Sequence, residues 1–141
     1  MFRAWTTALL ITLPAWAPAA QGADLTLHIR NVPEGGGTLM IAVVAGAAAF
    51  DGDEPAIASF LVPARSPAVT VSTSALPEGS YAVRVMHDRN GNGELDSNLV
   101  GMPTEPWGFS NDASGGFGPP AWDDARFELA GDTVQQINLN H

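Results

Sequence analysis

The chain has 141 residues and a formal net charge of −9, because fifteen aspartates and glutamates outnumber six basic residues. All six basic residues are arginines, and the chain has neither lysine nor cysteine. An acidic protein of this kind repels phosphate backbones, so nucleic acid is not an expected partner. The absence of cysteine excludes disulfide bonds and a cysteine nucleophile.

Residues 1–23 have the pattern of a secretory signal peptide, with a positive charge at Arg3, an apolar run over Ala4–Ala17 and small residues after it. The run contains a proline and is shorter than the roughly 20 residues that a transmembrane helix needs. We expect cleavage just before Ala23 or Asp24. The mature protein would then be periplasmic or secreted, with no membrane insertion.

Residues 24–141 are enough for one domain with a single core. No segment of helical length repeats with a period of 3.6 residues, whereas short segments of alternating or continuous apolar character, separated by turns, are typical of strands. This spacing predicts an all-β fold, a seven-stranded Greek-key β-sandwich, with a small barrel as the alternative. The predicted strands are 25–30, 38–45, 56–62, 68–74, 80–86, 125–129 and 133–139.

Short links between these segments predict which strands are neighbours. Three consecutive pairs are expected to lie side by side: 25–30 with 38–45, 56–62 with 68–74, and 125–129 with 133–139.

A loop with oxygen-bearing side chains at alternate positions follows the fifth predicted strand. It has the sequence H-D-R-N-G-N-G-E-L-D-S-N over His87–Asn98. Relative to a calcium-binding loop, the candidate ligands are Asp88, Asn90, Asn92, the backbone carbonyl of Glu94, and Asp96. Gly93 would permit the sharp bend that such loops require. The loop therefore predicts a Ca²⁺ site.

This calcium pattern is incomplete. A helix-loop-helix calcium site has a bidentate glutamate at its last position, where this chain has Leu99. We therefore expect weak binding, with a Kd of about 10⁻⁴ to 10⁻³ M. The alternative is an ordinary tight turn, since asparagine, aspartate and glycine are the residues that turns prefer.

The segment Gly101–Trp122 is long for a connection in a small domain. Its aromatic residues, Trp107, Phe109, Phe117 and Trp122, stand among polar side chains. Such rings are suited to a groove that binds a glycan, a peptide or an envelope protein. Alternatively, the rings fix the segment to the side of the sandwich and cover a sheet edge.

Support for catalysis is limited to carboxylates in and after this segment, namely Glu105, Asp112, Asp123 and Asp124. Two of them could act as acid and base in a hydrolase for envelope polysaccharide, but sequence spacing does not bring any pair together. No serine has the context of an activated nucleophile. The sequence therefore assigns no catalytic residue and favours a protein that is not an enzyme.

Three stretches carry a resemblance to a known family: L-P-E-G-S-Y-A-V-R-V-M-H-D-R-N-G-N-G-E-L-D-S-N, G-M-P-T-E-P-W-G-F-S-N-D-A and F-G-P-P-A-W-D-D-A-R-F. With them the mature chain resembles the DUF2141 family of uncharacterised bacterial exported proteins. This resemblance implies a domain but no reaction. The shorter stretch Leu76–Val83 is similar to the turn and strand of transthyretin-like and CnaB-like modules, which implies a β-sandwich.

These patterns together predict an exported binding or structural module. Its Asp88–Asp96 loop would hold a Ca²⁺ ion that stiffens the Gly101–Trp122 segment. The hydrolase is the alternative.

Overall fold

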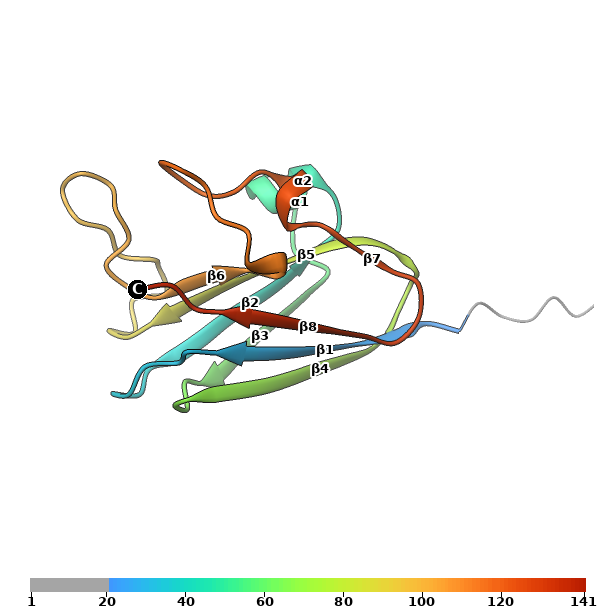
Figure 1. Cartoon of the computed structure of the whole chain (residues 1–141), viewed down its shortest axis with the longest axis horizontal. Helices are drawn as coiled ribbons and strands as arrows, with labels where there is room; N and C mark the ends of the chain where they lie inside the picture. Colours follow the sequence, from blue (N-terminus) through green and yellow to red (C-terminus); the bar gives the residue numbers. More distant parts are fainter. Residues whose placement is uncertain (1–20) are drawn as a thin grey trace, which may run out of the picture.

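The computed structural model describes residues 21–141. The predicted signal peptide, residues 1–23, therefore lies almost wholly outside the described residues. The described chain folds into two β-sheets that face each other, with short helices and long loops on one side (Figure 1). None of the helices in residues 21–141 is long and apolar enough to cross a membrane.

The smaller sheet has three strands in the order β4-β1-β8, formed by Ala68–Leu76, Ala23–Arg30 and Thr133–Asn138. β1 lies in the middle, antiparallel to β4 and parallel to β8. The alternation of β1 places Leu25, Leu27 and Ile29 on the inner face, where all three are fully buried.

The larger sheet has five strands. Four of them follow the order β3-β2-β5-β6, formed by Ala58–Pro63, Thr38–Val44, Gly79–Asp88 and Trp107–Phe109. β7, Phe127–Leu129, pairs with the beginning of β5, whereas β6 pairs with its second half. Two short strands, β7 and β6, therefore pair one after the other with the long strand β5.

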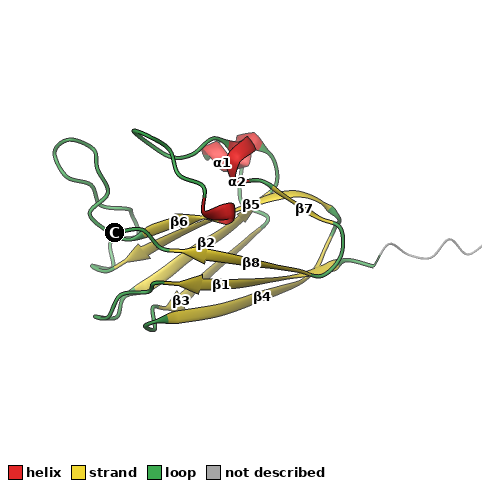
Figure 2. Cartoon of the chain, viewed as in Figure 1, coloured by secondary structure: helices red, strands yellow, loops and turns green. Residues whose placement is uncertain are grey.

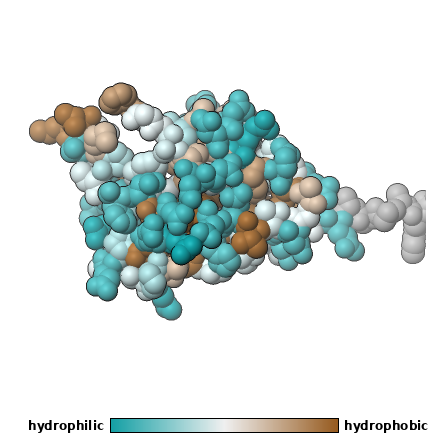
Figure 3. Space-filling model, in the orientation of Figure 1, coloured by the Kyte–Doolittle hydropathy of each residue, from teal (hydrophilic) through white to brown (hydrophobic). Residues whose placement is uncertain are grey.

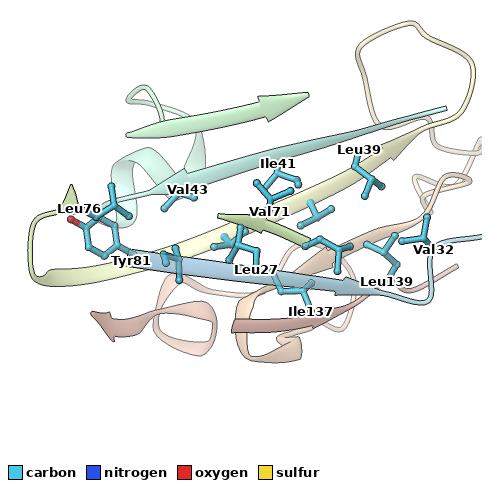
Figure 4. Close-up of a cluster of buried hydrophobic side chains, with 14 of the residues drawn as sticks. Leu27, Val32, Leu39, Ile41, Val43, Val71, Leu76, Tyr81, Ile137 and Leu139 are labelled. Carbon is cyan, nitrogen blue, oxygen red and sulfur yellow. The ribbon is translucent and has the colours of Figure 1, made fainter. Parts of the chain in front are cut away.

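The main hydrophobic core fills the space between the two sheets (Figure 4). It includes Leu27 of β1, Ile41 of β2, Val85 of β5 and Ile137 of β8. Burial of side chains of this size contributes about 1.5–3 kcal/mol each, so the sandwich is stabilised without disulfides. Tyr81 also packs in this core, and its hydroxyl donates a hydrogen bond to the Pro77 carbonyl, 2.7 Å away. Burial raises the pKa of this hydroxyl.

The predicted all-β sandwich is confirmed. All seven predicted strands are present with small shifts of their ends, and an eighth strand, β6, is added. β6 has three residues, too few to show an alternating pattern. Three one-turn helices were also not predicted: α1 at Ala47–Asp51, η1 at Ser110–Asp112 and α2 at Trp122–Ala125 (Figure 2).

The three predicted strand pairings are wrong. β1 and β2, β3 and β4, and β7 and β8 each lie in different sheets, so the links between them cross the sandwich. Stacked sheets are about 10 Å apart, and five residues of extended chain easily span that distance. Alternation shows which face of a strand is buried, but it does not show which strand lies beside it.

Candidate functional site

The outer face of the larger sheet is apolar over most of its width. The pairing registers align two rows of outward-facing side chains across four strands. The first row is entirely apolar and consists of Leu61, Met40, Met86 and Trp107. The second row consists of Ser59, Ala42, Arg84 and Phe109. An antiparallel sheet with one solvated face usually has polar side chains there.

These two rows form the floor of a groove of about 850 Å³. Its walls come from the loops before and after β6, which contribute Val100, Met102 and Phe117. All three side chains are exposed, and Phe117 makes almost no contact with the protein, with a relative exposure of 104%. Apolar residues gather on the two projecting loops at the upper left of the molecule (Figure 3). The groove therefore presents apolar surface on its floor and on its walls.

A row of aromatic rings lines one side of the groove. Trp107 and Phe109 have ring centroids 5.7 Å apart, and Phe109 lies 5.7 Å from Phe50 of α1. Phe50 in turn contacts Trp122 of α2 at 6.0 Å. Three of the four predicted aromatic ligand-binding residues, Trp107, Phe109 and Phe117, thus line the groove. The fourth, Trp122, packs behind Phe50 in a second apolar cluster and is not among the lining residues.

One basic side chain lies on the groove floor. Arg84 is partly buried, and its Nη1 donates a hydrogen bond to the Phe50 carbonyl at 3.0 Å. In residues 21–141, neither ion pair of the structure includes Arg84. Asp51 is the one carboxylate among the lining residues, and it is exposed at the end of α1.

Strand β6 supplies the two aromatic residues of the floor. Its position depends on close packing of Gly108 against β8 and on the hydrogen bonds of Ser110, the residue that follows the strand. A Cβ on Gly108 would lie 2.9 Å from Ile137 Cγ2 and 3.1 Å from the Asn138 carbonyl oxygen, so only glycine lets β6 approach β8 this closely. Ser110 is fully buried. Its hydroxyl donates to the Ala125 carbonyl at 2.6 Å and accepts from the Val83 amide at 2.9 Å, in the gap between the β6 and β7 pairings of β5.

The Asp88–Asp96 loop follows β5 and borders the groove through Leu95. The Asp88 carboxylate accepts hydrogen bonds from the backbone amides of Gly93, at 2.9 Å, and Gly91, at 2.8 Å. These bonds, that of Gly93 foremost, lower the pKa of Asp88 below its ordinary value of 3.8, although partial desolvation acts in the opposite direction.

The remaining predicted calcium ligands lie together in the same loop. The side-chain oxygens of Asn90 and Asn92 accept from the amides of Asn92 and Glu94, at 3.2 and 3.0 Å. Their amide nitrogens both donate to the Asp96 carboxylate, that of Asn92 at 2.7 Å. The side-chain NH2 groups of Asn90 and Asn92 therefore face Asp96. Both side chains would have to rotate for their oxygens to bind a cation beside Asp96.

Glu105, which we considered as a possible catalytic acid, has a structural role. It is buried, and its two carboxylate oxygens accept from the amides of Arg89, at 2.9 Å, and Asp96, at 3.1 Å. One carboxylate therefore ties both ends of the Asp88–Asp96 loop to the chain that enters β6. The composition of the segment gave no sign of this contact, because it joins positions far apart in the loop.

Two of the other candidate acids have partners of their own, and the third is exposed. Asp112 accepts from the backbone amide of Asn138 at 2.8 Å and from its side chain at 2.7 Å. Asp123 forms an ion pair with Arg126 at 3.1 Å, and Asp124 is exposed. Within residues 21–141, no three side chains among histidine, cysteine, aspartate and glutamate come close enough together to hold a metal ion. Any cation in the Asp88–Asp96 loop would depend on asparagine and backbone oxygens.

His87, beside this loop, is fully buried. Its Nε2 lies 2.6 Å from the Gly36 carbonyl oxygen, so Nε2 carries the proton and donates. Its Nδ1 is the one buried side-chain polar atom of the described residues without a hydrogen-bond partner.

Several groove residues were missed by sequence reasoning, notably Met40, Leu61, Arg84 and Met86. A signal existed in β5, where Val83 and Val85 alternate with Ala82, Arg84 and Met86, so that apolar residues fall on both faces. Among residues 21–141 no long helix is available to cover the outer side of such a strand, so an apolar outer face indicates cover by loops or a ligand.

Comparison with known proteins assigns a family but no function. No curated protein and no solved structure matches the chain. A family model described as "Uncharacterized protein conserved in bacteria (DUF2141)" matches residues 27–138, which include every strand of the sandwich at least in part. The chain therefore belongs to the DUF2141 family.

Proposed function

We propose that the protein is an exported binding module that holds an apolar small molecule in the groove on the outer face of its larger sheet. The observation that carries this proposal is the apolar row of Leu61, Met40, Met86 and Trp107, which crosses four strands on a face that would ordinarily be solvated. Most ligand pockets are concave, mainly apolar and about 300–1,000 Å³ in volume, and the groove has these properties.

The composition of the groove favours an apolar ligand over the glycan that the sequence suggested as one possible partner. A glycan groove combines aromatic faces with several hydrogen-bonding side chains around them. Here the floor and walls contain methionine, leucine, valine and phenylalanine, with few polar side chains among them. An apolar ligand therefore fits the groove better than a glycan does.

A fluorescent probe tests this proposal. N-phenyl-1-naphthylamine is a neutral apolar dye whose emission rises in apolar surroundings. With the protein expressed from its full-length coding sequence, we expect saturable binding with one site per chain. Leu61→Glu should weaken it about tenfold or more, because it places a charge on the apolar floor.

The matched control is Val134→Glu in β8. Both positions are exposed strand residues, 72% for Leu61 and 61% for Val134, but Val134 lies outside the groove. We expect both variants to keep the wild-type melting temperature within a few degrees, because surface changes usually have small effects. If the two variants bind the dye equally well, or if wild type does not bind it, the groove is not a ligand site.

A second function concerns the Asp88–Asp96 loop, for which we propose weak, stabilising Ca²⁺ binding. What supports it is that Asp88, Asn90, Asn92 and Asp96, four side chains with oxygen atoms, lie in one tight loop and are already bonded to one another or to its backbone amides. Ca²⁺ takes six to eight oxygen ligands, which carboxylates, amide oxygens, a backbone carbonyl and water would supply. Because Glu105 links this loop to β6, an ordered loop also steadies the groove.

Thermal unfolding tests the calcium proposal. At 10 mM Ca²⁺ and a Kd of about 10⁻⁴ to 10⁻³ M, the linkage relation predicts a stabilisation of about 1.4–2.7 kcal/mol over the protein in chelator. We expect this stabilisation to disappear in Asp96→Ala and to persist in Asp53→Ala, an exposed position in another loop. Equal melting temperatures in chelator and in calcium would contradict the proposal.

A further inference from the structure

We infer that the ligand of the groove is a single-chain carboxylate amphiphile, a long-chain fatty acid anion, whose head group binds Arg84. This inference rests on the proposed function, and it adds the chemical class of the ligand. It is carried by the position of one cation beside an otherwise apolar row.

An amphiphile needs an apolar surface for its chain and a charged or polar group for its head, and the two rows of the floor supply one each. The row of Leu61, Met40, Met86 and Trp107 offers apolar surface with no charged side chain. The next row contains Arg84, with Ala42 directly opposite it on β2. Both residues line the groove, so the guanidinium borders the same space as the apolar row. Arg84 lies two residues from Met86 on β5, so an acyl chain that begins beside Met86 and runs over Met40 to Leu61 would have its head group next to Arg84.

The bonding of Arg84 leaves donors for such a head group. A guanidinium has five N–H donors in a planar fork that matches a carboxylate. In the described part of the chain its side chain has one hydrogen bond, to the Phe50 carbonyl, and no ion pair. That carbonyl also fixes the orientation of the guanidinium. A partly buried cation without a counter-ion gains more from a carboxylate than an exposed arginine does, because less water competes for it.

The charge of the whole protein opposes any anion, because the net charge is −9. Asp51, the other charged residue of the lining, adds to this repulsion from the end of α1. A carboxylate ligand is therefore retained only through contact with Arg84. This makes the prediction sharp, since an acidic protein without a specific site would favour a cationic amphiphile instead.

The methionines of the floor suit a flexible chain. Met40 and Met86 are adjacent in the first row, and both are partly buried. Methionine side chains are unbranched and polarizable, so they adapt to ligands of variable shape. We expect the site to tolerate changes in chain length better than changes in the head group.

The experiment compares three ligands that share a twelve-carbon chain: dodecanoate, 1-dodecanol and dodecylammonium. Each displaces N-phenyl-1-naphthylamine from the wild-type protein at concentrations below micelle formation. We expect dodecanoate to bind about tenfold or more tightly than dodecanol, as charge-assisted hydrogen bonds require, and dodecylammonium to bind most weakly. Equal affinities, or a preference for dodecylammonium, would overturn the inference.

Variants of Arg84 then locate the head group. Arg84→Gln should lower the affinity for dodecanoate about tenfold or more and abolish its preference over dodecanol, while Arg84→Lys should keep part of that preference. Arg126→Gln is the matched control, because Arg126 forms its ion pairs with Asp123 and Glu128 outside the groove. Unchanged discrimination in Arg84→Gln would overturn the inference.

These outcomes separate the two claims. Dye binding that Leu61→Glu weakens, together with no preference for dodecanoate, would leave the apolar groove and remove the fatty acid anion. Absence of dye binding in wild type would remove both. If Arg84→Gln does not fold, the head-group comparison in the wild-type protein still decides the inference.

Discussion

The outer faces of the two sheets differ, although both belong to one sandwich with one shared core. On the three-stranded sheet, the outward side chains of β1 and β4 are polar and pair with one another, and Val134 of β8 is an exposed apolar exception. The Thr26 hydroxyl lies 3.2 Å from the Ser72 hydroxyl, and His28 Nδ1 lies 3.0 Å from the Thr70 hydroxyl. On the five-stranded sheet, the corresponding surface carries the apolar row that begins at Leu61. Stability of the core does not require an apolar outer face, so this face is where a binding function is expected.

The two faces also differ in what covers them. The five-stranded sheet has α1, α2 and the long loops around β6 on its outer side (Figure 2). The loops around β6 belong to the chain between β5 and β7. No comparable loops cover the outer face of the three-stranded sheet in the described residues. The changes below test this difference, from the largest expected effect to the smallest.

Gly108→Val should have the largest effect. The new side chain would collide with Ile137 and the Asn138 carbonyl and push β6 away from the sandwich. We expect a loss of about 3 kcal/mol in the free energy of unfolding, measured by denaturant titration, together with loss of dye binding. Gly116→Val is the matched control, because nothing lies within 4 Å of a Cβ at that glycine. Equal stability of the two variants would mean that β6 is not held in this way.

Ser110→Ala should cost about 2 kcal/mol. It leaves the Val83 amide and the Ala125 carbonyl without the partner that the buried hydroxyl supplies. Ser114→Ala, at an exposed position of the same segment, should change stability by about 0.5 kcal/mol or less. A Ser110→Ala variant as stable as Ser114→Ala would contradict the bridging role of this hydroxyl.

Asp88→Asn should have a smaller effect that depends on pH. The lowered pKa of Asp88 means that its ionised form stabilises the folded state. This contribution is fully present above the ordinary carboxyl pKa of 3.8 and is lost as the pH falls through the lower folded value. Wild type should therefore exceed the variant in stability at pH 6, and the difference should shrink towards pH 2. A difference that is constant over this range would contradict the assignment.

Thr26→Ala, on the outer face of the smaller sheet, should have the smallest effect. It removes one exposed hydrogen bond to Ser72, so we expect a change of about 0.5 kcal/mol or less. Binding of N-phenyl-1-naphthylamine should be unchanged, since this face is not part of the groove. Weaker dye binding in this variant would indicate that the dye binds the three-stranded sheet and would contradict the proposed groove.

The sequence predicted the strands well and their arrangement poorly. Alternation in Leu25, Leu27 and Ile29 reports burial of one face, and that burial is what the structure shows. Which strands pair depends on contacts between distant residues, such as Leu27 with Val71, and no local pattern encodes them. For this reason the class of fold was predictable, whereas the three neighbour assignments were not.

The candidate site shows the same limit. The aromatic residues of the segment Gly101–Trp122 drew attention to the correct part of the chain, and three of the four line the groove. The floor could not be predicted, because Leu61, Met40 and Met86 come from three different strands and meet only through the register. The hydrogen bonds of Glu105 could not be predicted for a related reason: its partners Arg89 and Asp96 are brought to it by the closure of the loop.

The most direct measurement of the central claim is a map of backbone amide NMR shifts on titration with N-phenyl-1-naphthylamine. The proposed site predicts saturable shifts in the strands of the groove floor, around Met40, Leu61, Met86 and Trp107, and in the two loops that form its walls. The amides of β1 and β4 should not move. Shifts centred on β1 and β4, or no saturable shifts on the larger sheet, would contradict the account.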